Sequence, residues 1–460
     1  MISRSTDARL LGLGEILVGG LLVVTPFVLV PAAADAFDLP KQMVAEMFAL
    51  ASLLALALRA LLNPRLASLD LGPKELWEVP AVRALLPLGL VASLGLVVSS
   101  HGAHVRQALP DLWIGVACVI GWSVGLSPRR QRRLLVLLAL PAVVLGALAI
   151  LQFHELYRPF AFSGGEEAAR LGLTSLAGNA GVLAAFLVLP ALLAQEWGWR
   201  RRQHRPSALA ALVTVVVCLY GIAVSQTVAA VLAVVLGSAC LWLVQLPRRR
   251  ALTALGAAAA VLLVTIAAVA PLRSKVVAKV TELTSGEWNK VLTGRLDGWS
   301  TAWWMVQRNP LTGVGHGAYS AEFAEAKIAL TDDGHLFLQR PRQVMFVNAH
   351  NEFLEVAAEW GLVGVAALAW ALWVLWRRLR GLEPADRPLA YAGCVGLGIL
   401  AVAHFPFRVA LVAFPALLFL SWILSPGEGE LPEPAAVAAV SPKSGPPAAS
   451  RKKAKKRKRR

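Results

Sequence analysis

Residues 207–246 read SALAALVTVVVCLYGIAVSQTVAAVLAVVLGSACLWLVQL, a run without a single charged side chain. The run is about twice as long as the roughly 20 apolar residues that cross the hydrocarbon core of a bilayer. Gly221 and the polar triplet Ser225, Gln226 and Thr227 mark the natural place for the chain to turn. The segment therefore predicts two consecutive transmembrane helices.

The rest of the chain has the same character, with 57% hydrophobic residues, 16% charged residues and a mean hydropathy of +0.62. These values exclude an ordinary soluble domain of this length. Apolar runs of suitable length predict an all-α polytopic membrane protein with about twelve transmembrane helices. The expected spans lie near residues 10–31, 43–62, 81–99, 107–126, 132–152, 177–196, 207–224, 226–246, 252–271, 352–376, 388–403 and 408–424.

The first of these runs also imitates a cleavable signal peptide. Arg4 and Arg9 precede it, and the small residues 32–34 follow it like a cleavage site. The run is long for a signal peptide and has the right length for a span, so we expect it to be retained as the first helix.

Arginine and lysine predict the orientation, because short loops rich in these residues stay in the cytoplasm. Such clusters occur in every second expected loop, at residues 129–133, 200–205, 248–250 and 377–387. Both termini are then cytoplasmic. Residues 1–424 form the transmembrane bundle, and residues 272–350 form one large periplasmic loop between the ninth and tenth helices.

Residues 425–460 are rich in Pro, Gly, Glu, Ala and Ser and end in RKKAKKRKRR. Such a segment cannot bury a core, so we expect a disordered cytoplasmic tail that binds anionic membrane lipids. Binding of the tail to RNA or to a partner protein is the alternative. The formal net charge of +17 lies mostly in short clusters between apolar runs, which indicates membrane topology and not a nucleic-acid-binding domain.

The cysteines predict neither disulfides nor a thiolate metal site, because all of them fall inside apolar segments at unrelated spacings. They are Cys118, Cys218, Cys240 and Cys394. The adjacent acids Asp332 and Asp333 have no convincing partners for a cation, so the sequence predicts no metal and no cofactor.

Residues 294–310 of the expected loop predict a helix that lies at the membrane interface. Leu296, Trp299 and Trp303 have the spacing of one helical face, and Pro310 would end the helix. Arg295 stands at its start, where a guanidinium can bind a phosphate with two parallel hydrogen bonds. An arginine that only reaches the headgroup phosphates of the membrane is the alternative.

A glycine-rich segment follows. Gly313, Gly315, His316 and Tyr319 precede a helix that Ser320 could cap. Backbone amides in such a segment can approach an anion closely, and a helix N-terminus favours negative charge. A glycine-rich connector that binds no ligand is the alternative.

His350 lies where the expected loop enters the tenth span, in what should be the first helical turn. Asn351 and Glu352 follow it, and Glu355 and Glu359 continue at helical spacing. The positive end of the helix disfavours imidazolium, so the ring should stay neutral and able to accept a proton, as a general base must. One glutamate could orient the imidazole or meet an arginine. A capping histidine without chemistry is the alternative.

Three basic residues outside the loop are expected on the same side. Arg170 precedes the sixth span, near the segment 174–179, and is well placed for a second phosphate contact. Lys41 precedes the second span and Arg408 the twelfth. Each of these two could equally be an interfacial anchor.

Taken in order, these motifs resemble the O-antigen ligase and polymerase superfamily. The residues that carry the resemblance are Gly294-Arg295, Asn309-Pro310-Leu-Thr-Gly313-Val-Gly315, His350-Asn351-Glu352-Phe353-Leu354, Glu359 and Gly361-Leu-Val-Gly364, with Arg170, Thr174 to Asn179 and Leu39-Pro40-Lys41 upstream. The chain departs from the family pattern at Gly178-Asn179-Ala180, where many relatives have Asn-Pro-Asn, and at Gln226, where an arginine is common.

The resemblance implies an inverting, metal-independent glycosyltransferase in the inner membrane of a bacterium, with its active site on the periplasmic side. Arg170 and Arg295 match the family's diphosphate-binding arginines, and His350 matches its catalytic histidine. The glycan would move from undecaprenyl diphosphate to lipid A core or to another glycan. We favour an O-antigen ligase, with the related polymerase as the alternative.

A twelve-helix transporter or flippase is the rival from another class. Transporters commonly show internal repeats, and the sequence shows none between its halves. A structural membrane protein without chemistry is a third interpretation.

Overall fold

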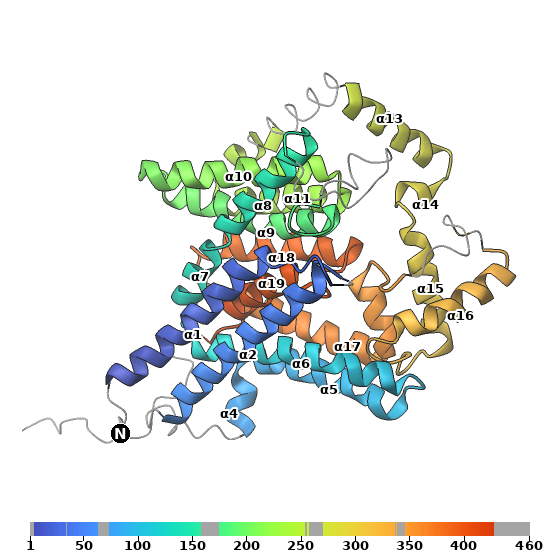
Figure 1. Ribbon diagram of the computed structural model, residues 1–460, viewed down its shortest axis with the longest axis horizontal. Coiled ribbons are helices and arrows are strands. Elements are labelled where there is room, and N and C mark those ends of the chain that lie inside the picture. Colours follow the sequence, from blue (N-terminus) through green and yellow to red (C-terminus); the bar gives the residue numbers. More distant parts are fainter. Residues whose placement is uncertain are drawn as a thin grey trace, which may run out of the picture.

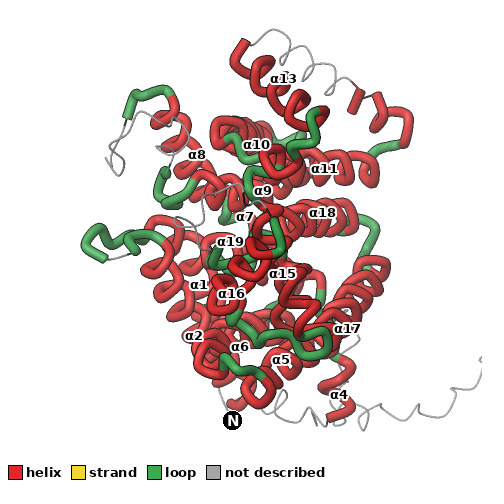
Figure 2. Tube along the Cα trace, turned by 90° about the vertical axis from the view of Figure 1, so that its right-hand side faces the viewer, coloured by secondary structure: helices red, strands yellow, loops and turns green. Residues whose placement is uncertain are grey.

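The computed structural model describes residues 4–33, 35–62, 73–157, 174–253, 255–256, 270–335, 337 and 346–426. Figures 1 and 2 show that this part of the chain is built from helices joined by loops, with no strand. The all-α class predicted from the sequence is therefore confirmed.

Most of the expected spans appear as long helices. Those that match are α1 (Arg4–Val24), α2 (Asp38–Leu62), α5 (Pro80–Val98), α6 (Gly102–Gly125), α7 (Pro128–Val136) with α8 (Ala139–Phe153), α9 (Ala180–Arg200), α10 (Arg205–Ser225), α11 (Val228–Gln245), α17 (Glu352–Gly381), α18 (Arg387–Ala403) and α19 (Ala410–Ile423).

Within the described ranges, nine segments are long and apolar enough to cross a membrane, and α18 and α19 are shorter apolar helices. Most of the expected ninth span, together with the basic tail, lies outside the described residues. A polytopic membrane protein is confirmed, while the count of twelve stays a prediction.

The remaining elements are short or belong to the expected large loop. They are η1 (Thr25–Phe27), α4 (Pro73–Glu78), α13 (Ala270–Thr284), α14 (Trp288–Val291), α15 (Arg295–Arg308) and α16 (Tyr319–Asp332). Figure 1 shows α13 to α16 together along one side of the molecule, next to the start of α17.

The long apolar run 207–246 does turn where its polar residues predicted. Helix α10 ends at Ser225, Gln226 adopts a left-handed conformation with φ of 55°, and α11 starts at Val228. The hydroxyl of Ser225 bonds to the carbonyl of Ile222 at 2.7 Å. Ser225 and Gln226 thus form the turn between the two predicted helices.

Helix α9 forms the centre of the bundle. Its sequence is apolar on every side, and 83% of the residues in its apolar 18-residue stretch are buried, as is typical of a helix surrounded by protein. Helices α8, α10, α11 and α18 pack against it. Glycines allow some of these backbones to approach closely, since a Cβ added at Gly237 of α11 would lie 3.1 Å from the carbonyl oxygen of Ala392 in α18.

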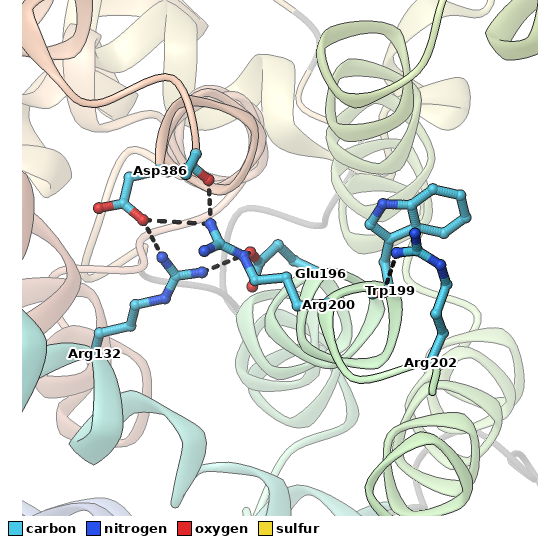
Figure 3. Close-up of polar contacts among 7 residues, drawn as sticks. Arg132, Glu196, Trp199, Arg200, Arg202 and Asp386 are labelled. Atoms are coloured by element: carbon cyan, nitrogen blue, oxygen red, sulfur yellow. Dashed lines mark hydrogen bonds and ion pairs between the residues drawn. The ribbon is translucent and has the colours of Figure 1, made fainter. Parts of the chain in front are cut away.

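An ion network ties α7, α9 and α18 together at one end of the bundle (Figure 3). Arg132 pairs with Asp386 and, at 2.5 Å, with Glu196; Arg200 pairs with Glu196 and, at 3.3 Å, with Asp386. Nearby, the guanidinium of Arg202 lies 4.6 Å from the ring of Trp199. Three of the arginine-rich loops therefore meet at one end.

The loops expected on the opposite side meet one another as well. Ser99, before α6, donates to the carbonyl of Val314, and His101 lies 2.6 Å from Glu322 of α16. Arg408, before α19, pairs with Glu359 of α17. The grouping of loops agrees with the alternating topology, and the assignment of one end to the cytoplasm stays a prediction from the arginines.

Candidate functional site

The site is built on a break in α17 at Gly361. This residue has φ of 62° and ψ of −160°, a conformation that essentially only glycine adopts. The segment 310–315 crosses the break, because the amide of Leu362 donates to Pro310 at 2.8 Å and the amide of Gly315 donates to Glu359 at 2.8 Å. A Cβ at Gly361 would lie 2.4 Å from the carbonyl of Leu311, so glycine is required for this close approach.

Gly313 is required for the same reason. Its φ is 66°, and an added Cβ would lie 2.3 Å from the carbonyl carbon of Glu359. The next amide, that of Val314, donates to Ala358 at 2.9 Å. The amides of Val314 and Gly315 are thus used to bridge α17, and the glycines of this motif serve the contact between two backbones.

The anion that meets the glycine-rich segment belongs to the chain itself. The carboxylate of Glu359 lies 3.1 Å from Nδ1 of His316 and accepts from the amide of Tyr319 at 3.4 Å. His316 is buried and also lies 3.2 Å from the indole nitrogen of Trp360. The expectation that Ser320 caps the next helix is wrong, because α16 starts at Tyr319 and has no side-chain cap.

Tyr319 serves to join two helices. It is almost fully buried, and its hydroxyl donates to the carbonyl of Gly298 at 2.9 Å and lies 2.8 Å from the hydroxyl of Thr301. Burial raises the pKa of Tyr319, so the phenol stays protonated. Its contacts connect α16 to α15, which contains Arg295.

Arg408 is held by the glutamates of α17. Its guanidinium lies 2.8 Å from Glu355 and 2.8 Å from Glu359, and the amide of Phe407 donates to Glu352 at 3.1 Å. The prediction that one of these glutamates meets an arginine is confirmed, and Arg408 is a structural ion-pair partner more than an interfacial anchor. Loss of one partner would leave a buried charge unpaired, which is strongly destabilising.

Glu355 also fixes the backbone next to His350. Its second oxygen accepts from the amide of Ala349 at 2.9 Å. Asn351 caps α17, since its side chain accepts from two amides of the first turn at 3.0 Å each. The expectation that His350 lies in the first turn is wrong, because His350 precedes the capping residue and has a left-handed φ of 56°.

The imidazole of His350 has a defined tautomer. Its Nδ1 lies 3.1 Å from the carbonyl oxygen of Asn348, and a carbonyl can only accept. Nδ1 therefore carries the proton, and Nε2 carries the lone pair. The ring packs edge-on against Phe346 and Phe405, with centroid distances of 5.4 and 4.9 Å.

The neutral state expected for His350 has a different physical cause from the predicted one. Burial lowers the pKa of His350, the bond to Asn348 opposes this shift, and the positive charge of Arg295 adds to the lowering. The ring is thus unprotonated near pH 7 because of its surroundings, and the end of α17 is not needed to explain it.

Arg295 is close enough to His350 for its charge to lower the pKa of that imidazole. It begins α15 after Thr293 and Gly294, which both have positive φ. Its Nε donates to Ala403 at 2.9 Å, and its Nη1 donates to Thr293 at 2.6 Å. A Cβ at Gly298 would lie 3.1 Å from the carbonyl oxygen of Ala349, so α15 packs directly against the His350 segment.

His404 joins this site and was missed in the sequence. The amide of Phe405 donates to its Nδ1 at 2.8 Å, so the neutral ring carries its proton on Nε2. Burial, together with the nearby His350 and Arg295, lowers the pKa of His404 to about 4. The signal that could have found it is a histidine between two apolar helices, where ionisable residues are usually functional.

His404 also reaches the start of α9. Gly181 lies against His404, since a Cβ added to this glycine would be 3.3 Å from Nε2 of His404. The same Cβ would be 3.1 Å from the side-chain oxygen of Asn179. Asn179 caps α9 by accepting from the amide of Gly181 at 2.7 Å. The site thus extends from α15 across the α18–α19 connection to the N-terminus of α9.

Two further predicted residues remain, Lys41 and Arg170. Lys41 is buried, and its ammonium donates to the carbonyls of Val28 at 2.8 Å and Phe37 at 3.2 Å. It therefore closes the loop before α2 instead of anchoring the helix at the membrane surface. Arg170 lies outside the described residues, so its phosphate contact stays a prediction.

Comparison with known protein families gives a match. A protein-family model described as O-antigen ligase matches residues 213–369. The matched segment contains Arg295, the glycine-rich segment and His350, and it ends before His404 and Arg408. No curated protein matches the sequence.

Proposed function

Because residues 213–369 place this chain in the O-antigen ligase superfamily, we propose that it is a membrane glycosyltransferase that moves a glycan from a lipid diphosphate to an acceptor hydroxyl. The donor would be undecaprenyl diphosphate, and the acceptor lipid A core or another glycan. The multiple apolar helices agree with an enzyme that works on a lipid-linked substrate.

One observation carries the proposal, namely a neutral imidazole with an unprotonated Nε2 beside a guanidinium. His350 has the state that a general base needs, and its pKa is lowered by burial and by Arg295. Arg295 supplies a positive charge for an anionic group of the substrate. A histidine that only capped a helix would not need either feature.

The proposed reaction needs little more than these groups. The oxygen of the acceptor hydroxyl attacks the anomeric carbon while its proton moves to Nε2 of His350. The bond between that carbon and the diphosphate breaks, and the lipid diphosphate leaves with the electron pair. A diphosphate is a good leaving group, so charge stabilisation by arginine can replace protonation.

In this mechanism, Arg295 and Arg170 bind the diphosphate and His350 acts as the base. The network of Glu355, Glu359 and Arg408 holds the backbone next to His350, so in this mechanism it would act by positioning the base. We place the site on the periplasmic face of a bacterial inner membrane. We favour a ligase over a polymerase, which would differ only in the acceptor.

The test is transfer by purified protein from lipid-linked glycan to lipid A core and, separately, to a second lipid-linked glycan. His350→Ala should lower the rate at least 10²-fold, since loss of a general base typically costs 10²- to 10⁴-fold. His154→Ala is the matched control, because His154 is exposed and its ring bonds to Tyr220, outside the site.

The acceptor that receives glycan separates ligase from polymerase. A wild-type protein that transfers to neither acceptor would refute the proposed activity and favour the transporter instead. Equal transfer by both histidine variants, with both proteins present in the membrane, would remove His350 from the mechanism.

A further inference from the structure

A cavity of about 460 Å³ lies beside the site, and indole rings form much of its wall. Trp299, Trp303 and Trp304 come from α15, His335 follows α16, and Leu354 comes from the first turns of α17. The cavity is thus at the junction of the three helices that surround His350 and Arg295.

One indole is presented to an occupant. Trp303 is 56% exposed, although indole is among the largest apolar side chains. The ring of Trp304 is covered differently, because the guanidinium of Arg308 lies 4.7 Å from it. Trp303 therefore offers a flat apolar surface at the cavity.

The wall also contains polar side chains. Ser300 and Gln307 line the cavity, and a hydroxyl and a side-chain amide can each donate and accept hydrogen bonds. A purely apolar occupant such as an acyl chain would displace water from these groups without replacing its hydrogen bonds, which is unfavourable.

A sugar chain meets both requirements. A pyranose ring has an apolar face of C–H groups that can stack on an indole, and hydroxyls around its edge that can donate and accept. Since α15 rises about 1.5 Å per residue, Trp299 and Trp303 lie roughly 6 and 12 Å along the helix from Arg295.

From this arrangement we propose that the cavity binds a glycan segment, with a sugar ring on Trp303 and hydroxyls on the polar wall. The inference rests on the proposed function and adds a subsite to it. A glycan that reacts next to Arg295 and His350 would extend along α15 into the cavity. The glycan belongs either to the lipid-linked donor or to the acceptor, and kinetics can distinguish the two.

The test compares Trp303→Ala with Trp288→Ala in the full-length protein. Trp288 is the matched control, because it is also 56% exposed and lies on α14 outside the cavity. Loss of stacking at Trp303 should raise one KM about five- to ten-fold with little change in kcat. A higher KM for the donor assigns the cavity to the donor glycan, and a higher KM for the acceptor assigns it to the acceptor glycan.

A binding measurement separates this inference from the proposed activity. Tryptophan fluorescence is titrated with two free glycans from the host organism, the core oligosaccharide of its lipopolysaccharide and the glycan released by acid from its lipid-linked donor. Quenching that Trp303→Ala loses and Trp288→Ala keeps supports the cavity even if transfer fails. Unchanged KM values and unchanged quenching in Trp303→Ala would overturn the glycan subsite. An effect of this variant only on the lipid requirement of the enzyme would overturn it as well.

Discussion

At the residue scale, the charge of Arg295 acts on the proton affinity of His350. The reaction needs the neutral ring, so kcat/KM should fall as the pH drops through the pKa of His350, which burial and Arg295 hold below the ordinary histidine value. Arg295→Gln removes a positive charge that lowers this pKa. The acidic limb of the pH–rate profile should therefore move to higher pH in the residual activity of this variant.

Arg295→Lys is the control for this prediction, because it keeps the charge and loses the planar geometry. Its acidic limb should stay where the wild-type limb is, even if its KM for the lipid-linked donor rises. If the limb has the same position in the glutamine and lysine variants, the electrostatic coupling of Arg295 to His350 is absent.

The sequence predicted the chemistry of single residues better than their contacts. The order of motifs pointed to Arg295 and His350, and the structure brings both to one site. The order of motifs did not point to His404. The place of this histidine in the site depends on the packing of the α18–α19 connection against residues more than 50 positions away in sequence. The position of Lys41 before a span predicted an interfacial anchor, whereas its ammonium donates to two carbonyls of the loop before α2.

At the element scale, the break in α17 should be sensitive to a single methyl group. Gly361→Ala places a Cβ within 2.4 Å of the Leu311 backbone, in a conformation that alanine avoids. We expect a destabilisation of about 3 kcal/mol or more, measured as a lower thermal unfolding midpoint in detergent.

Gly381→Ala provides the control on the same helix. An added Cβ there meets nothing within 4 Å, so this change should be neutral or stabilise the helix by about 0.5–1 kcal/mol. Equal unfolding midpoints for both variants would mean that segment 310–315 does not bridge α17 as described.

Helices were predictable from the sequence because apolar runs and turn residues are local signals. Helix α15 was expected over 294–310 and extends from Arg295 to Arg308. The break in α17 was not predictable, since its apolar pattern continues through Gly361 and its cause is a segment about 50 residues earlier. The partner of the glycine-rich segment was equally hidden, because Glu359 is an anion from the same chain.

At the scale of the whole molecule, the two ends of the bundle differ in charge. The arginine-rich loops meet around Arg132, Glu196, Arg200 and Asp386, whereas the residues proposed for catalysis meet at the loops expected on the other side. Positive loops are retained in the cytoplasm during insertion. The site should therefore face the periplasm, where the proposed donor presents its glycan.

Cysteine labelling in intact cells tests this orientation. Asp333 follows α16 and Arg202 lies between α9 and α10, and both side chains are exposed at positions where a thiol can be reached. A membrane-impermeant maleimide, applied after opening of the outer membrane, should label Asp333→Cys at once. It should label Arg202→Cys only after the inner membrane is permeabilised.

The unmodified protein is the control, because Cys118 and Cys218 are buried and Cys240 and Cys394 lie within apolar helices. The reverse pattern would place His350 in the cytoplasm, where a periplasmic acceptor could not reach it, and the proposed reaction would then fail on topology alone.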